Sequence, residues 1–238
     1  MSSRLRLGKI DIEVVQKDIR NVHLSVHPPA GRVRIAAPAH MKLDTIRVFA
    51  ISKLDWIRQQ QAKLRKQDRE TPRDYVDRES HYVWGRRYLL KVIEEESPPR
   101  VELSPRTLRL YVRPGTDRER RRLILESWYR EQLHAGIRHL LAQWESLLDV
   151  KAARYFVQQM KTKWGSCNPA RRNIRINTEL AKKPPQCLEY ILVHELVHLL
   201  EPSHNARFIS LMNQCMPDWR ARRDQLNQLP VRHDDWDY

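Results

Sequence analysis

The chain has 238 residues, of which 41% are hydrophobic and 31% charged, and its formal net charge at pH 7 is +15. This length allows a buried core and either one domain or two small ones. Because no run of about 18 apolar residues occurs and charges interrupt the first thirty residues, we expect neither a membrane span nor a secretory leader. The three cysteines form no CxxC pair, which is typical of reduced thiols, so a cytoplasmic location is expected.

Positive charge is concentrated in the front part of the chain. Residues 1–115 carry 24 Lys/Arg and 14 Asp/Glu, a net charge of +10, whereas residues 116–238 carry 20 and 15, a net charge of +5. A basic surface attracts polyanions over long distances, which makes a nucleotide or a nucleic acid a candidate partner. The alternative is that these charges only keep the surface solvated.

Alternating apolar and polar residues predict β-strands in the front part. One is expected at 10–15, and the segment 22–38, with the turn residues HPPAGR at its centre, is typical of a β-hairpin. Between 43 and 66 apolar residues recur every three or four positions, which predicts an amphipathic helix with a basic outer face. A polar connector at 68–80 precedes the remaining strands, which are expected at 81–95 and 100–115.

The back part is predicted to be mostly helical. Asp117 can cap a long helix whose apolar stripe continues to Leu148. Two strands are expected on either side of a loop at 164–169, and three helices follow them. The predicted ranges are 151–163 and 171–178 for the strands, and 184–202, 208–215 and 219–229 for the helices.

Together these elements predict an α+β protein in two parts. Pro114-Gly115 is the strongest break in the pattern, so we expect a β-rich basic N-terminal part at 1–115 and a second domain at 116–238. No internal repeat is evident in the sequence.

Three of the ten histidines lie within the stretch YILVHELVHLLEPSHNARF, at 190–208. Residues four apart on a helix lie one turn above each other, so His194 and His198 can direct two imidazole nitrogens at one point. Glu195 lies about 100° further round and cannot share that point, but it can take a proton from a water bound there. This HExxH pattern predicts a metal site with Glu195 as the general base.

A third ligand is expected from the residues after the helix. Pro202 disfavours a longer helix, so the chain can turn back and bring His204 to the metal. Three protein ligands leave a position for water, as in hydrolytic zinc sites. Glu201 is the alternative ligand if the helix continued for one more turn, and Pro202 argues against that. Sites of three histidines also accept Mn, Fe, Co or Ni.

The run TKWGSCNPARRNIRINTELAKKPPQCLEYILVHELVHLLEPSHNARF resembles the YgjP-like metallopeptidase domain family, which is itself similar to the SprT-like zinc proteins. VHPPAGRVRIAAP and WIRQQQAKL in the front part share this resemblance. The resemblance implies Zn²⁺ held by His194, His198 and His204, with Glu195 as general base. It also implies a zincin-like helical back half with a small antiparallel sheet, in which the strand Asn173–Thr178 pairs with an extended peptide.

The segment Trp164-Gly165-Ser166-Cys167 has two interpretations. Its backbone or the Ser166 hydroxyl could stabilise an oxyanion. The favoured alternative is structural, with Trp164 as a core anchor and Gly165 at a positive φ. Cys167 is not expected to be a nucleophile. Tyr190, one turn before His194, is either a donor to the reacting oxygen or a packing residue.

Three functions remain open from the sequence. The first is a zinc-dependent metallohydrolase, most simply a metallopeptidase acting on peptides or proteins. The second is a metal-dependent nucleotide (phosphoanhydride) hydrolase, in which Arg171, Arg172, Arg175 and Arg207 neutralise phosphate charge. The third is a nucleic-acid-associated protease or binding module that uses the basic front part.

Overall fold

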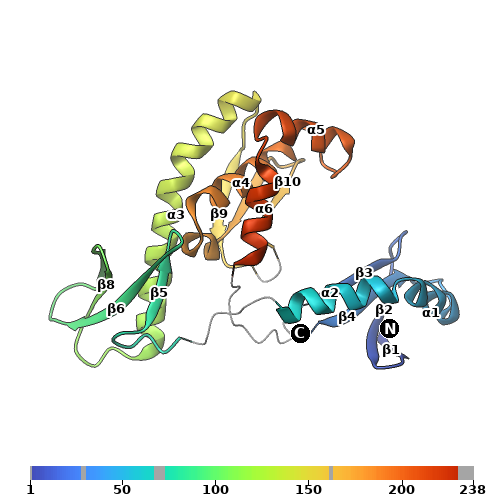
Figure 1. Ribbon diagram of the computed structural model, residues 1–238, viewed down its shortest axis with the longest axis horizontal. Coiled ribbons are helices and arrows are strands. Elements are labelled where there is room, and N and C mark those ends of the chain that lie inside the picture. The colour runs from blue at the N-terminus through green and yellow to red at the C-terminus, as the bar shows by residue number, and fades with distance from the viewer. Residues whose placement is uncertain (1, 28–30, 67–72, 161–162, 230–238) are drawn as a thin grey trace. The chain divides into compact units, whose positions relative to one another are not determined.

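The computed structural model describes residues 2–27, 31–66, 73–160 and 163–229. They form two compact units, one within Met1–Thr71 and one within Pro72–Leu229, each with its own hydrophobic core. The described residues contain six α-helices, one 3₁₀ helix and three small sheets, so the predicted α+β class is confirmed (Figure 1). No helix in the described part of the chain is both long and apolar enough to cross a bilayer.

In the first unit, two helices cover one face of a four-stranded sheet. The sheet order is β1-β2-β4-β3, in which β2 and β4 are parallel and the outer pairs are antiparallel. Ile46, Ala50 and Ile57 of the helices share the core with apolar residues of the sheet. The elements are β1 (Ser2–Leu7), β2 (Ile10–Lys17), β3 (His23–His27), β4 (Arg32–Pro38), α1 (Leu43–Ser52) and α2 (Leu54–Lys66).

Two expectations for this unit need correction, and one is confirmed. The single helix expected at 43–66 is two helices, because the chain turns at Lys53. Strand β1 was not predicted. The hairpin at 22–38 is confirmed as the antiparallel pair β3 and β4, and residues 28–30 of its turn lie outside the described residues.

The second unit opens with a sheet of the same topology. Its order is β5-β6-β8-β7, again with a parallel central pair and antiparallel outer pairs. The fold therefore repeats a four-stranded arrangement that the sequence does not reveal, because topology depends on the apolar pattern and the turns rather than on residue identity. The strands are β5 (Ser80–Val83), β6 (Arg86–Glu94), β7 (Arg100–Leu103) and β8 (Thr107–Val112).

The unit boundary differs from the one predicted at residue 115. Strands β5 to β8 belong to the second unit because they pack on the long helix α3 (Arg118–Leu148). The Tyr129 hydroxyl of α3 donates to the Tyr82 carbonyl at 2.8 Å, and Leu108 and Leu133 lie in one core. Pro114-Gly115 is a short turn within this unit. Of the connector expected at 68–80, residues 68–72 lie outside the described part.

The remaining elements surround a three-stranded sheet of order β10-β11-β9. Helix α3 begins as predicted, since Asp117 Oδ1 accepts from Arg120 N at 2.7 Å. The helices expected at 208–215 and 219–229 are also present. The elements are β9 (Arg154–Gln158), β10 (Gly165–Asn168), β11 (Asn173–Asn177), the 3₁₀ helix η1 (Thr178–Lys182), α4 (Pro185–Val197), α5 (Ala206–Cys215) and α6 (Trp219–Gln228).

Three expectations for this sheet are wrong. The sheet is mixed rather than antiparallel, since β11 is antiparallel to β10 and parallel to β9. Much of the loop expected at 164–169 is strand β10. Because β11 is the central strand, both of its edges are occupied, and it cannot pair with a peptide in the way expected for Asn173–Thr178. Of the strand expected at 151–163, residues 161–162 are not described.

We expect His81 on β5 to reduce stability at acid pH. Its side chain is 4% exposed, and burial lowers its pKa from 6.5 to about 4, although the carboxylate of Glu79 opposes this shift. Because the folded pKa lies below the unfolded one, the unfolded chain binds the proton first. Stability is therefore lost as the pH falls from about 6.5 to about 4, by at most ~3 kcal/mol.

Urea unfolding at pH 7.5 and pH 4.5 measures this loss. The variant His81→Phe removes the titrating group, so its loss of unfolding free energy should be the smaller one. An equal loss in both proteins would show that His81 does not cause it.

Candidate metal centre

The helix that carries the HExxH motif is buried on nearly all sides. Pro185 stands at its first turn, and its buried residues include Leu192, Val193, Leu196 and Val197. The helix ends at Val197 rather than at Pro202 as predicted. His198 keeps helical dihedral angles as the C-cap residue, and Glu201 N donates to Val197 O at 2.9 Å.

The turn after α4 brings His204, the third histidine, back to His194 and His198. Asn205 caps α5, since its Oδ1 accepts from Phe208 N at 3.0 Å. His204 therefore occupies the last position before this cap and is held by the start of α5. The sequence predicted this return of the chain from Pro202, and the Asn205 cap was not predicted.

The three imidazoles converge. One possible ligand nitrogen from each of His194, His198 and His204 lies within 4.8 Å of the other two, and the Nε2 atoms of His194 and His204 are 3.0 Å apart. A tetrahedral zinc ion with bonds of about 2.0–2.1 Å holds its ligand nitrogens about 3.3 Å apart. The donor set and its spacing therefore fit a divalent transition metal.

A hydrogen bond orients His198, and one phenylalanine ring packs against all three imidazoles. His198 Nδ1 donates to the Glu201 carbonyl at 3.0 Å, which leaves its Nε2 with a free lone pair. Phe208 is 2% exposed, and its ring centroid lies 4.9, 4.7 and 4.8 Å from those of His194, His198 and His204. Among the described residues, the buried Nδ1 of His194 has no hydrogen-bond partner.

Burial favours the neutral form of two of the imidazoles, those of His194 and His198. It lowers the pKa of His194 to about 3, with a further contribution from His198 and His204. It also lowers the pKa of His198, against a hydrogen bond to Glu201 that raises it. Neutral imidazole is the form that binds a metal, so these two side chains are in the ligating form near pH 7.

Glu195 lies in an apolar environment beside strand β10. Its side chain is 5% exposed, and burial raises the pKa of its carboxyl to about 8, while the charge of Lys163 lowers it. Strand β10 lies next to α4 (Figure 1). A Cβ atom at Gly165 would meet Glu195 Oε1 at 2.6 Å and Ile191 Cγ2 at 2.8 Å. Glycine at 165 therefore makes room for the carboxylate.

This geometry corrects one part of the structural interpretation of the segment 164–167, the reason for Gly165. Gly165 is not among the residues with positive φ, so it is required by the approach of Glu195 rather than by its own conformation. Alternation along β10 directs Ser166 to the opposite sheet face, away from Glu195, which argues against an oxyanion role for its hydroxyl. Trp164 packs against the core, as the structural alternative predicts.

The variant Gly165→Ala tests this close approach. The added methyl group should destabilise the protein by about 1–3 kcal/mol and displace Glu195, because neither α4 nor β10 has free space there. Urea unfolding and a peptide-hydrolysis assay measure the two effects, and Ser166→Ala, on the opposite face, should change neither. Unaltered stability and activity in Gly165→Ala would refute the requirement for glycine.

The other candidates near the motif have ordinary roles. The Glu201 carboxylate faces solvent and accepts from Ser203, so it contributes to the centre through its backbone carbonyl. Tyr190 is 5% exposed and packs edge-on, 5.9 Å from His194, as a packing residue does. Burial raises the pKa of the Cys167 thiol to about 11, with a smaller contribution from Glu195, so the thiolate is scarce.

Of the four arginines expected beside the cleft, Arg175 and Arg172 have side chains that make contacts elsewhere on the sheet. Arg175 lies on the same sheet face as its neighbour Ser166 and stacks over Phe156 at 5.8 Å. Arg172 Nε donates to the Lys151 carbonyl at 2.6 Å, Arg171 N donates to Asn168 Oδ1, and Arg207 is exposed. The role of Arg171 and Arg207 in neutralising a phosphate at the histidines therefore stays a prediction.

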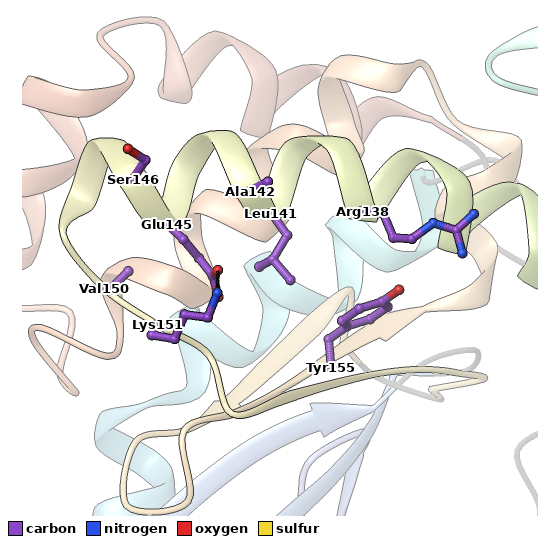
Figure 2. A pocket seen from close by; sticks show the side chains of 8 residues that line it. All are labelled: Arg138, Leu141, Ala142, Glu145, Ser146, Val150, Lys151 and Tyr155. Carbon is purple, nitrogen blue, oxygen red and sulfur yellow. Dashed lines mark ion pairs between the residues drawn. The ribbon is translucent and has the colours of Figure 1, made fainter.

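A separate cavity of about 510 Å³ lies between α3 and β9, at the opposite edge of the sheet from β10 (Figure 2). The buried Glu145 carboxylate at its wall accepts from Ala152 N at 2.8 Å and pairs with Lys151 at 2.9 Å. These partners satisfy the buried charge of Glu145 in the cavity wall. Its other lining residues are Arg138, Leu141, Ala142, Ser146, Val150 and Tyr155.

Comparison with known families places the chain among the metallopeptidases. Residues 20–229 match the family model described as YgjP-like, metallopeptidase domain, which is nearly the whole chain. The chain therefore belongs to the YgjP-like metallopeptidase family. Membership implies a divalent metal and a peptide or protein substrate.

Two solved structures are similar to a part of the chain. The metallopeptidase zymogen of abylysin, from Pyrococcus abyssi, is 17% identical with a TM-score of 0.36, and the match covers 40% of this chain and 98% of that one. For the metallopeptidase zymogen of jannalysin, from Methanocaldococcus jannaschii, the values are 18%, 0.36, 39% and 88%. No curated protein matches the chain in sequence.

Proposed function

We propose that the protein is a zinc-dependent metallopeptidase in which His194, His198 and His204 hold the ion and Glu195 is the general base. One observation carries this proposal: the imidazoles of three histidines converge, and Glu195, next to the first of them in the chain, has a side chain that is 5% exposed. Without a shared partner, the buried His198 and Glu195 side chains would be costly. When bound, the ion would polarise the scissile carbonyl and make a water more acidic. The zincin-like part would consist of α4 and the sheet above it.

Glu195 performs the proton transfers. Its carboxylate takes a proton from the attacking water and delivers it to the leaving amine, a task that suits an acid with a pKa near the working pH. Gly165 holds β10 close, so bulk water has little access to the carboxylate. Phe208 and the Glu201 carbonyl hold the imidazoles in their orientation.

The free edge of β10 supplies a place for the peptide. Asn177 N donates to Trp164 O at 2.9 Å, so by the alternation of antiparallel bonds the backbone of Ser166 faces β11. The backbone groups of Gly165 and Cys167 then face the free edge, next to Glu195. An extended peptide would add to β10 there, in place of the expected pairing with Asn173–Thr178.

A turnover screen tests both the activity and the docking mode. Zinc-loaded protein should cleave unstructured peptides, and should fail on the same peptides when backbone amides beside the scissile bond are N-methylated, since they cannot pair with a strand. Nucleoside triphosphates, assayed in parallel for phosphate release, should remain intact. Release of phosphate without peptide cleavage would contradict the peptidase proposal and indicate that the site hydrolyses phosphoanhydrides.

A further inference from the structure

The first unit carries an excess of positive charge that the metal centre does not use. Residues 2–66 contain 14 Lys/Arg and 5 Asp/Glu, a net charge of +9, out of +15 for the whole chain. In the part of this unit that the structure describes, no group of histidine, cysteine or acidic side chains is placed to hold a metal. A basic unit without such a site is suited to binding a partner by charge.

The arginines gather on the sheet face that the helices leave open. Helices α1 and α2 pack on the face that carries Ile12, Val33 and Ile35. Side chains alternate along a strand, so the neighbouring positions point to the other face. Four of these positions are arginines, which we call the arginine face: Arg4 and Arg6 on β1, and Arg32 and Arg34 on β4.

The strand register arranges these side chains in two columns. Glu13 on β2 lies between Arg4 and Arg34, and Asp11 lies opposite Arg6. The columns are therefore two strand spacings apart, about 10 Å, and arginines within a column are about 7 Å apart. That second spacing equals the axial rise of two nucleotides along one strand of a duplex, about 7 Å.

The two carboxylates do not neutralise the face. Arg34 pairs with Glu13 and Arg6 with Asp11, each at 3.8 Å, and the side chains of the second pair are 77% and 78% exposed. Such exposed pairs are weak, and among the described residues of the strands this face carries two acids and four arginines. The pKa of the neighbouring His27 reflects this positive charge. Burial lowers that pKa most, and the charges of Arg34 and Arg32 lower it further.

We propose that the arginine face binds the phosphate backbone of duplex nucleic acid. Guanidinium groups donate paired hydrogen bonds to phosphate oxygens, and backbone contacts need no particular base. No Phe, Tyr or Trp lies on the described part of this face, which removes the stacking that single strands use. The large apolar side chains exposed in this unit, which an anionic membrane would need, lie on the helices instead: Leu43, Val48, Ile51 and Trp56.

Fluorescence anisotropy with the full chain tests the proposal, using a labelled 24-base-pair DNA duplex and an RNA duplex of the same sequence. In the double variant Arg4→Gln, Arg34→Gln, the slope of log K against log salt should be smaller in magnitude by about 2. At 200 mM salt this variant should bind about tenfold more weakly than the unaltered protein. The matched control, Arg47→Gln with Arg58→Gln, makes the same charge change on α1 and α2 and should bind nearly as the unaltered protein does.

A third variant gains binding and so does not depend on damage to the fold. Glu13→Gln removes the acid between two arginines and should bind either duplex severalfold more tightly. Equal binding of DNA and RNA would support contacts to phosphate alone, and a preference for one would identify the duplex that this face binds. Equal weakening in the face variant and its control, no duplex binding at 50 mM salt, or binding to phosphatidylserine vesicles alone would overturn the proposal. None of these results depends on peptidase activity.

Discussion

Replacing Glu195 with glutamine should reduce peptide hydrolysis about 10²- to 10⁴-fold while the metal stays bound. The amide keeps the size of the carboxyl group in its buried place beside Gly165, but it cannot accept the proton of water. The three imidazoles are unchanged, so metal affinity should remain. Steady-state kinetics on a cleavable peptide and elemental analysis of the same sample measure the two quantities.

The control for this substitution is Glu131→Gln, which makes the same chemical change at an exposed position of α3. It should keep full activity. If Glu195→Gln retained more than a tenth of the activity, or if it lost its metal together with its activity, Glu195 would not be the general base.

Replacing Phe208 with alanine should destabilise the protein and also weaken metal binding. The ring is 2% exposed and contacts all three imidazoles, so its loss leaves a cavity beneath them. Truncation of a buried phenylalanine costs about 3–5 kcal/mol. Loosened imidazoles should bind the ion about 10–100-fold more weakly. Urea unfolding of the metal-free protein and competition with a zinc-binding dye measure these effects separately.

Ile209→Ala is the matched control, since it truncates the next residue of α5, which is 38% exposed. It should change metal affinity little. Phe208→Leu should recover most of the stability but only part of the affinity, because leucine fills the space without the flat ring. A Phe208→Ala protein that is destabilised yet binds zinc as tightly as before would show that Phe208 is only a core residue.

The sequence predicted the parts of the site that follow from local geometry. Residues four apart share a helix face, so His194 and His198 were placed together from their spacing alone, and Pro202 predicted the return to His204. The roles of Gly165 and Phe208 were not predicted. The reason for Gly165 lies in the approach of a strand to α4 from another part of the chain, and that approach leaves no mark in local spacing.

The errors in the fold have the same origin. A short segment such as Gly165–Asn168 is compatible with either a loop or an edge strand, and pairing with a neighbour decides, as β11 does for β10. Strand direction also depends on connections rather than on composition, so the parallel pairs β2·β4, β6·β8 and β9·β11 could not be predicted from alternation. The long helix α3, with its Asp117 cap, was predicted because both signals are local.

Elemental analysis of zinc-loaded protein after gel filtration tests the metal centre most directly. We predict one divalent ion per chain in the unaltered protein and in Glu195→Gln, and almost none when both His194 and His198 are replaced with alanine. A metal-free unaltered protein, or a metal content that survives the loss of both imidazoles, would contradict the proposed centre and the peptidase mechanism that depends on it.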